Sequence, residues 1–452
     1  MPSLVIHPIA RPLTGSVPLP ADKSIAHRAL IFAALARGRS RVVASAAGED
    51  NAATAAAFRA MGVRIEAGDA GAIVVDGAGL LGLAAPAGPI DCGNSGTTMR
   101  LLAGVLAAQR FRTTLVGDAS LSRRPMERVA RPLRLRGARI EGLLDPKRPG
   151  ECTAPLQIGP LPEPQVLCAL EHELTVASAQ VKSAVLLSGL FADGPTYVRE
   201  PTLSRDHTER MLSALGVPIR AMGSMAELDP SAWSGELPAF DVTVPGDLSA
   251  GAFVLAAAHL VPGSRVDLRG VGLNPTRTGM LEVLRDMGGA FEIEAHGEAM
   301  GEPFGLVRAG SAALSAARVG GEIVARAIDE VPILCGLAAR ARGVTTIVDA
   351  GELRVKETDR IAAMAGVLRA FGVACEEQAD GLVIEGRPEG PLRAADVDSR
   401  GDHRIAMTAA VLGLVADGKV RVRDAACIRT SFPKFVGTMR ALGATIEVEE
   451  ER

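Results

Sequence analysis

Two segments of this sequence carry charged side chains that could perform acid–base chemistry on an anionic substrate. The segment IDEVP places Asp329 and Glu330 among apolar residues, and the segment ELRVKETDRIAAM contains Lys356, Glu357 and Arg360. Two carboxylates in a water-poor site can act as general base and general acid when their environments differ. Lys356 and Arg360 are four residues apart, so we expect them to share one helix face, where they could bind an anion or form an exposed charged surface.

Two further cations stand where a helix normally favours acidic residues. The stretch PADKSIAHRAL predicts a helix that begins after Pro20 and carries Lys23 and Arg28 in its first two turns. The backbone N–H groups and the macrodipole are positive at a helix start, so cations there indicate either a solvated face or a bound anion. A matching stretch 225 residues later, VPGDLSAGAFVL, has Leu248 and Phe253 at the same positions. The helix itself does not require the cations, which favours the anion site.

Other motifs also contain groups suited to anions. DCGNSGTTMR has glycines that let backbone amides approach a ligand, although a capped loop without a ligand explains it as well. The run RRPM supplies Arg124, which could equally be a surface charge. SAQVK places Ser178 and Gln180 at an expected helix start, where capping alone would explain Ser178. GDHRIAM puts Arg404 at the start of an apolar helix in the second half of the chain.

Composition limits the classes of partner. The chain has 452 residues, of which 48% are apolar and 22% are charged, so we expect a globular protein of two to three domains. Its 49 basic and 52 acidic residues leave a formal net charge of −3, and only 3% are aromatic, which argues against nucleic acid as a partner. Apolar runs long enough for a membrane span and a signal-peptide core are absent, so we expect a cytoplasmic protein without a membrane partner. The six cysteines form no CxxC pair and the histidines show no ligand spacing, so we expect no metal.

A repeat places these motifs at the starts of helices. A helix tail, a glycine and a β-branched stretch recur at intervals of 71 to 84 residues. The glycines are Gly62, Gly137, Gly216, Gly288, Gly372 and Gly443. Glycine suits the position just after a helix, before a strand. A second, apolar helix recurs in each unit, and its expected caps are Asp22, Asn94, Ser178, Asp247, Asp329 and Asp402.

The repeat also predicts an α/β protein with two domains of three βαβα-type units each. The 225-residue offset is half of the chain and places the boundaries near Pro20 and near Pro245. The first domain would be residues 1–20 plus 246–452, and the second would be residues 21–245.

Taken together, these motifs resemble the 5-enolpyruvylshikimate-3-phosphate (EPSP) synthase family. PADKSIAHR, GNSGTTMR, RRPM, SAQVK, RDHTE, NPTR, IDEVP, RVKETDR and DHRIAM occur in the order and spacing of the family between about residues 15 and 440. SAQVK, RDHTE and NPTR are similar to the bacterial class II branch, which is known for tolerance to glyphosate. The resemblance implies six βαβαββ units, three per domain, in an inside-out α/β barrel whose domains close on the substrates.

The resemblance implies an activity as well. The enolpyruvyl group of phosphoenolpyruvate would be transferred to the 5-hydroxyl of shikimate 3-phosphate with release of phosphate, a step towards chorismate and the aromatic amino acids. It implies no metal or organic cofactor, and we expect a monomer. Glyphosate would be an inhibitor.

The resemblance assigns roles to the matching residues. Asp329 would take the proton of the attacking hydroxyl, Glu357 would protonate the methylene carbon, and Lys23 would assist at the hydroxyl. The residues that would bind shikimate 3-phosphate are Lys23, Ser24, Arg28, Ser178, Ala179, Gln180, Arg205, Asp329 and Lys356. Those that would bind phosphoenolpyruvate are Lys23, Asn94, Gly96, Thr97, Arg124, Gln180, Arg360 and Arg404.

Some residues depart from the pattern of the family. Gly96 stands where class II members tend to have alanine, Leu101 replaces a proline frequent in class I, and Thr430 replaces a lysine of class I. From these residues we expect intermediate glyphosate tolerance.

Two alternatives remain at this point. The sister transferase that acts on UDP-N-acetylglucosamine uses a reactive cysteine near RRPM, and no cysteine lies between Cys92 and Cys152 here. A non-catalytic phosphate-binding protein on the same fold would lack the acid, the base or a clamp residue.

Overall fold

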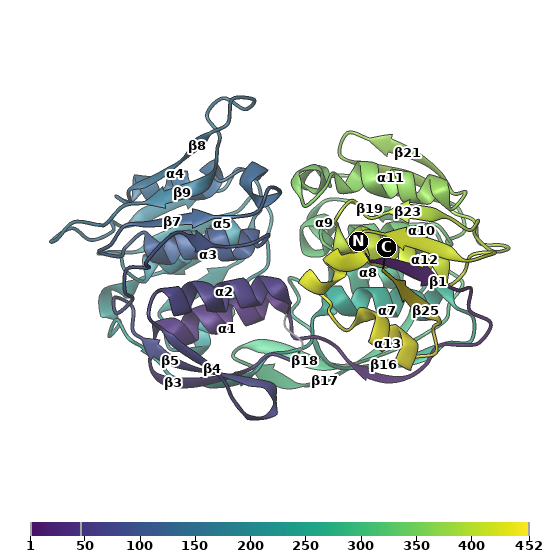
Figure 1. The fold of residues 1–452 in the computed structure, drawn as a ribbon, viewed down its shortest axis with the longest axis horizontal. Coiled ribbons are helices and arrows are strands. Elements are labelled where there is room, and N and C mark those ends of the chain that lie inside the picture. The colour runs from purple at the N-terminus through teal and green to yellow at the C-terminus, as the bar shows by residue number, and fades with distance from the viewer. Residues whose placement is uncertain (1, 46–47, 451–452) are drawn as a thin grey trace. The chain divides into compact units, whose positions relative to one another are not determined.

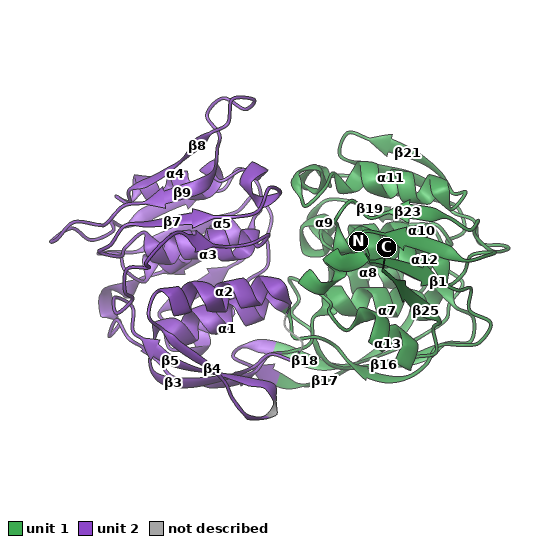
Figure 2. Cartoon of the chain, viewed as in Figure 1, with its two compact units in different colours: residues 1–22, 245–297, 303–452 green, residues 23–244, 298–302 purple. Residues whose placement is uncertain are grey.

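The protein divides into two compact units. The computed structural model describes residues 2–45 and 48–450 (Figure 1). Unit 1 comprises residues 1–22, 245–297 and 303–452, and unit 2 comprises residues 23–244 and 298–302 (Figure 2). The chain leaves unit 1 after Asp22 and returns at Pro245, whereas the repeat placed these boundaries after residue 20 and before residue 246.

One short segment belongs to a different unit from the one expected. The sequence assigned all of residues 246–452 to one domain, but residues 298–302 belong to unit 2. They form the tip of the hairpin between β17 (Ala290–Ala299) and β18 (Glu302–Gly310). In unit 2 the buried Glu302 Oε1 lies 2.8 Å from His207 Nδ1, and Arg210 Nη1 donates to the carbonyl of Gly301 at 3.2 Å. These tertiary contacts place the tip in unit 2, and a repeat pattern cannot reveal them.

Each unit contains three β-sheets within the described residues, which confirms the six units that the resemblance implies. In unit 1 the strand orders of the three sheets are β23–β24–β1–β25, β17–β18–β16–β2 and β19–β20–β22–β21. In unit 2 they are β10–β11–β13–β12, β6–β7–β9–β8 and β14–β3–β5–β4, and β15 also pairs with β3. The remaining strands of unit 1 are β1 (Ser3–Ile6), β2 (Thr14–Pro18), β16 (Arg265–Gly272), β19 (Arg318–Val319), β20 (Val344–Ile347), β21 (Ala374–Gln378), β22 (Gly381–Glu385), β23 (Asp396–Asp398), β24 (Val420–Arg423) and β25 (Ile446–Glu449). Those of unit 2 are β3 (Ala36–Val43), β4 (Arg64–Ala67), β5 (Ala72–Ala78), β6 (Ile90–Asp91), β7 (Thr113–Val116), β8 (Ile140–Leu144), β9 (Cys152–Ile158), β10 (Leu170–Glu173), β11 (Thr196–Arg199), β12 (Ile219–Met222), β13 (Met225–Leu228), β14 (Leu237–Pro238) and β15 (Asp241–Thr243).

The sheets follow from the order of elements in each repeat. β10 runs parallel to β11, and β11 and β12 each pair antiparallel with β13. A parallel pair requires a crossover connection, which helix α5 (Ala179–Gly189) supplies here. Two sheets include a strand from a segment that connects the units. Strand β2, which precedes the exit from unit 1, pairs with β16, and strand β15, which precedes the return to unit 1, pairs with β3. The N-terminal strand β1 lies between β24 and β25 near the C-terminus.

One helix of each repeat is buried on nearly all sides. These helices are α1 (Lys23–Leu35), α3 (Gly96–Leu106) and α5 in unit 2, and α7 (Leu248–Leu260), α10 (Val331–Ala338) and α12 (His403–Gly413) in unit 1. Every residue of α7, α10 and α12 is buried, as a helix that is apolar all round requires. The other helices are α2 (Glu49–Ala60), α4 (Glu127–Leu135), α6 (His207–Ala214), α8 (Gly279–Asp286), α9 (Glu322–Ala327), α11 (Arg360–Ala370) and α13 (Phe435–Ala441). Within the described residues no helix is both long and apolar enough to cross a membrane.

The repeated glycines occupy the backbone conformation that the pattern predicts. The six repeated glycines follow helices α2, α4, α6, α8, α11 and α13, and their φ angles lie between 77° and 112°. A residue with a side chain rarely adopts this region, so glycine ends each of these helices and lets the following strand begin.

Candidate functional site

The first turns of the three buried helices of unit 2 lie side by side. Gln180 Nε2, on α5, donates to Thr97 Oγ1, on α3, at 2.8 Å. Arg28 Nη2, on α1, donates to Ser183 Oγ, on α5, at 2.6 Å. The partly exposed residues of these helices all fall in the first turn. They are Lys23, Ser24, Thr97, Ala179 and Gln180, and each of them is a predicted site residue.

Arg28 is held by its own helix α1 and by two neighbouring helices, α5 and α6. Its side chain is buried, with Nε 2.7 Å from Thr208 Oγ1 on α6 and Nη1 2.9 Å from the carbonyl of Ser24. Together with the bond to Ser183, these contacts fix a guanidinium group near the first turn of α1. A fixed guanidinium offers several donors to a phosphate or carboxylate.

Lys23 has an acidic neighbour that sequence reasoning missed. Its Nζ lies 3.1 Å from Asp50 Oδ2, and the two side chains are 19% and 14% exposed. Asn51 Nδ2 also donates to the carbonyl of Lys23 at 3.0 Å. The only signal in the sequence was the acidic first turn of α2, which is also the ordinary composition of a helix start.

His27 lies between Lys23 and Arg28 on α1 and is fully buried. Burial lowers the pKa of His27 well below its usual value, and the charges of Lys23 and Arg28 lower it further. Its Nδ1 lies 2.7 Å from Thr54 Oγ1. The firm positive charges of this helix start are therefore Lys23 and Arg28.

Asn94 binds an arginine and does not cap a helix as we expected. The cap of α3 is Ser95, whose Oγ accepts from the amide of Thr98 at 3.1 Å. The Asn94 side chain instead accepts from Arg124 Nη2 at 2.6 Å and donates to Asp118 Oδ2 at 2.7 Å. Asn94 thus orients Arg124, which is a predicted phosphoenolpyruvate ligand.

Arg100 is a second residue that sequence reasoning missed. Its Nη1 donates to Gln180 Oε1. A methyl group at Gly96 would lie 3.2 Å from Nη1 of Arg100 and 3.2 Å from Nη1 of Arg124. The absence of a side chain at Gly96 therefore leaves room beside two guanidinium groups. Arg100 follows Gly96 by one helical turn, and that spacing was the available signal.

Ser178 and Arg205 border the same part of unit 2. Ser178 caps α5 as predicted, since its Oγ accepts from the amide of Val181 at 3.5 Å. The amide of Ser178 donates to Glu200 Oε1 at 3.2 Å. Glu200 also accepts from the amide of Ser204, which precedes Arg205, at 3.2 Å.

Unit 1 gathers the second set of predicted residues around Arg360. Arg360 is 1% exposed, with Nη2 2.7 Å from Glu357 Oε2, Nε 2.8 Å from Asp402 Oδ2 and Nη1 3.3 Å from Asp329 Oδ1. Burial works to lower the pKa of Arg360, but the charges of Asp402, Glu357 and Asp329 outweigh it and raise the pKa. This arginine is a permanent cation at the centre of the group.

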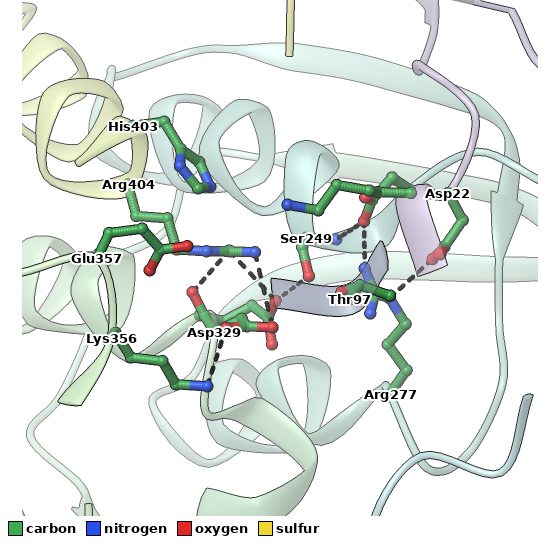
Figure 3. A network of polar contacts seen from close by, with 12 residues as sticks. Asp22, Thr97, Ser249, Arg277, Asp329, Lys356, Glu357, His403 and Arg404 are labelled. Atoms are coloured by element: carbon green, nitrogen blue, oxygen red, sulfur yellow. Dashed lines mark hydrogen bonds and ion pairs between the residues drawn. The ribbon is translucent and has the colours of Figure 1, made fainter. Parts of the chain in front are cut away.

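Asp329 has three cationic neighbours, and two of them, Lys356 and Arg404, are labelled beside it in Figure 3. Besides Arg360, Arg404 Nη2 lies 3.7 Å from Asp329 Oδ2, and Arg404 Nη1 donates to the carbonyl of Asp329 at 2.7 Å. Lys356 Nζ lies 4.0 Å from Asp329 Oδ1. Desolvation lowers the pKa of Lys356, although its side chain keeps 31% of its surface exposed and Asp329 partly opposes the shift.

Local structure differs from the sequence prediction at two of these residues. Helix α11 begins at Arg360 and is capped by Asp359, while Lys356 follows a 3-10 helix at Gly351–Val355. Lys356 and Arg360 therefore do not share a helix face, and Asp329 brings them together instead. Asp329 is not the cap of α10 either, because that position is Glu330, which makes no side-chain cap bond.

Two other predicted caps, Asp247 and Asp402, are confirmed in unit 1. Asp247 Oδ1 accepts from the amide of Ser249 at 2.8 Å, and Asp402 Oδ1 accepts from the amide of Arg404 at 2.9 Å. Ser249 Oγ in turn donates to Glu330 Oε1. The helix starts of α7, α10, α11 and α12 are therefore joined by polar contacts within unit 1.

The two groups suit different parts of one reaction on anions. Unit 2 presents Lys23 and Arg28 in the first two turns of α1 and the guanidinium of Arg124 beside Gly96, where α3 begins. Anions bind readily at helix starts. Unit 1 holds two carboxylates in different surroundings, because Asp329 has three cationic neighbours and Glu357 contacts Arg360. Such a pair can divide the roles of base and acid. Among the described residues, no group of three or more His, Cys, Asp or Glu is arranged to hold a metal ion.

Comparisons with known proteins agree with this chemistry. The family model of EPSP synthase (3-phosphoshikimate 1-carboxyvinyltransferase) matches residues 8–439. A 3-phosphoshikimate 1-carboxyvinyltransferase of Geobacter sulfurreducens is 50% identical over 443 residues, which cover 97% of this chain and 99% of that protein. One of Acidithiobacillus ferrooxidans is 49% identical over 448 residues and 99% of both chains. Among solved structures, EPSP synthase of Acinetobacter baumannii superposes with a TM-score of 0.87 at 41% identity, covering 100% of both chains.

Proposed function

Because the chain belongs to the EPSP synthase family, we propose that it transfers the enolpyruvyl group of phosphoenolpyruvate to the 5-hydroxyl of shikimate 3-phosphate. The reaction yields 5-enolpyruvylshikimate 3-phosphate and inorganic phosphate. In the addition step the hydroxyl oxygen bonds to C2 of phosphoenolpyruvate, the hydroxyl loses its proton and C3 gains one. In the elimination step C3 loses a proton while the bond between C2 and the phosphate oxygen breaks.

The residues of unit 2 suit the sugar phosphate. The proposed ligands in this unit are Lys23, Ser24, Arg28, Ser178, Ala179, Gln180 and Arg205, and unit 1 adds Asp329 and Lys356. Support comes from Arg28, whose guanidinium is fixed by Thr208 and Ser183, and from Ser178 at the start of α5. Charge-assisted bonds from such groups are strong and suit a phosphate.

Arginines from both units suit phosphoenolpyruvate. The proposed ligands are Lys23, Asn94, Gly96, Thr97, Arg124 and Gln180 of unit 2 and Arg360 and Arg404 of unit 1. Arg124 is oriented by Asn94, and Arg404 is oriented by the carbonyl of Asp329. The planar fork of arginine matches both the carboxylate and the phosphate of this substrate.

The carboxylates of unit 1 supply the proton transfers. Asp329 acts as the base on the hydroxyl, and Glu357 gives a proton to C3 in the addition and takes one back in the elimination. Lys23 assists at the hydroxyl and at the bridging oxygen. The observation that carries this assignment is the group of Asp329, Glu357 and Arg360, in which one buried arginine holds both carboxylates.

A thermal-shift titration tests the proposed function. Shikimate 3-phosphate followed by glyphosate should stabilise the protein strongly and cooperatively, since ligand binding to the folded state raises the melting temperature. A transferase for UDP-N-acetylglucosamine would respond to that nucleotide sugar instead. The near 50% identity to enzymes named for 3-phosphoshikimate does not favour that alternative. We further propose that the protein works as a cytoplasmic monomer.

A further inference from the structure

Unit 2 contains a buried cluster of charges that the reaction leaves without a role. Nζ of Lys182, on α5, lies 2.7 Å from Glu200 Oε2 and 2.8 Å from Glu209 Oε1. The three side chains are at most 5% exposed. Burial acts to lower the pKa of Lys182, but Glu209 and Glu200 outweigh it and raise the pKa, so the ammonium stays charged.

The helix packing does not require a lysine at this position. Four residues after the helix cap, α5 has Lys182, whereas α1 has Ala26 and α12 has Ala406, both of which are buried. Buried ion pairs also add little net stability compared with apolar packing of similar volume. The cluster therefore calls for a role other than stability.

Glu200 connects the cluster to two proposed ligands of shikimate 3-phosphate. Its Oε1 accepts from the amide of Ser178 at 3.2 Å and from Ser204 Oγ at 2.5 Å, and its Oε2 accepts from the amide of Ser204 at 3.2 Å. Ser178 is a proposed ligand, and Ser204 directly precedes Arg205, which is another. One carboxylate thus fixes the backbone at both ligands.

The same cluster reaches the third proposed ligand, Arg28, through adjacent residues. Thr208 Oγ1 accepts from Arg28 Nε at 2.7 Å and donates to Ser183 Oγ at 2.7 Å. Ser183 follows Lys182 on α5, and Thr208 precedes Glu209 on α6. The ion pair between Lys182 and Glu209 therefore ties together the two helices that hold Arg28.

We propose that Glu200 is a positioning residue for the binding of shikimate 3-phosphate, and that Lys182 and Glu209 hold Glu200 and α6 in place. This inference rests on the proposed function, which assigns three neighbouring residues to that substrate. Because all three side chains are buried, they act through the ligands and do not touch the substrate. The cluster should set affinity for shikimate 3-phosphate and leave the handling of phosphoenolpyruvate unchanged.

The variant Lys182→Met tests this inference against the matched control Arg136→Met. Arg136 is also a buried cation of unit 2 and contacts the same helix, with Nη1 3.0 Å from the carbonyl of Val185 and 2.6 Å from Ser188 Oγ. These contacts lie at the end of α5 away from Ser178. Both variants should lower the melting temperature.

Calorimetric titration with shikimate 3-phosphate alone gives the deciding comparison. Lys182→Met should raise its Kd by about 10- to 100-fold, the loss expected when hydrogen bonds to a charged group are disturbed, while KM for phosphoenolpyruvate stays unchanged. Arg136→Met should bind shikimate 3-phosphate like the parent. Equal weakening in both variants, or parent-like binding by Lys182→Met, would overturn the inference.

Ser204→Ala keeps the inference testable if Lys182→Met does not fold. This change removes only the hydroxyl bond to Glu200 and should raise the Kd for shikimate 3-phosphate by about 5-fold. Binding equal to that of the parent would contradict the role of Glu200. If the parent neither binds nor turns over shikimate 3-phosphate, the proposed function fails; if the parent does both and the variants bind equally well, only this inference fails.

Discussion

The substitution Asp329→Asn tests the assignment of the catalytic base. The amide keeps the size of the side chain and an oxygen that can accept from Arg360, but it cannot take the proton of the hydroxyl. A positioned general base contributes about 10²- to 10⁴-fold to a rate, which corresponds to about 3–5 kcal/mol of the barrier. We therefore expect kcat to fall by about that factor.

The surroundings of Asp329 indicate that the variant will fold. Arg360 keeps its contacts with Glu357 at 2.7 Å and Asp402 at 2.8 Å. The Asp329 side chain is 18% exposed and its partner Arg360 is 1% exposed, so the lost charge pairing should lower the melting temperature measurably. The KM values of both substrates should change little compared with kcat.

Single-turnover measurement of phosphate release, with both substrates bound, separates the chemical step from binding. Asp396→Asn is the matched control, because Asp396 pairs with Arg423 at 2.9 Å on an exposed strand of the same unit. The control should keep the parent rate. If Asp329→Asn retained more than about a tenth of the parent rate, Asp329 would not be the base.

Three further outcomes follow from the same structure. Glu357→Gln should cut turnover by about 10²-fold or more while phosphoenolpyruvate still binds, and near-normal turnover would remove Glu357 from the proton transfer to C3. Gly96→Ala should raise the glyphosate concentration needed for half inhibition and also raise KM for phosphoenolpyruvate, because its methyl group would lie 3.2 Å from guanidinium nitrogens of Arg100 and Arg124. Inhibition curves decide this, and an unchanged curve would show that space at Gly96 does not set tolerance. Desolvation lowers the pKa of Lys356 below the usual lysine value of about 10.4. Its ammonium group therefore loses its proton at a lower pH than that of an exposed lysine. KM for shikimate 3-phosphate should rise over that range in a pH profile, and Lys356→Arg should move the rise to higher pH; a profile identical in the two proteins would contradict a charged role for Lys356.

The repeat made the architecture predictable from the sequence. Six regularly spaced glycines end helices, and one apolar helix per repeat is buried, so six units could be recognised from spacing alone. The fold class that the sequence suggested is confirmed by the match to solved EPSP synthase structures. The same patterns could not show which unit holds the hairpin tip at residues 298–302, because the pair of Glu302 and His207 joins residues far apart in the chain.

Sequence rules for helix starts were least reliable where more than one residue could be the cap. Asn94 and Ser95 can both cap a helix, and spacing could not show that Ser95 does so while Asn94 binds Arg124. A helical reading of ELRVKETDRIAAM also failed, since Asp359 caps the helix and leaves Lys356 outside it. In both places tertiary contacts bring the side chain to its partner, Asn94 to Arg124 and Lys356 to Asp329.

Residues that act behind the site gave no distinctive signal in the sequence. Asp50 lies beside Lys23, and Glu200 lies behind Ser178, across 27 and 22 residues of chain respectively. Buried charges are rare, and a sequence does not reveal which charged residue will be buried. Lys182 illustrates this, since SAQVK drew attention to Ser178 and Gln180 while its lysine became buried between two glutamates.

Phosphate release with both substrates, and with each omitted in turn, tests the central claim most directly. We predict rapid release of inorganic phosphate when phosphoenolpyruvate and shikimate 3-phosphate are present together, matched by an equal amount of 5-enolpyruvylshikimate 3-phosphate. Each substrate alone should release none. Release from phosphoenolpyruvate alone, release with UDP-N-acetylglucosamine in place of shikimate 3-phosphate, or no release at all would contradict the proposed function.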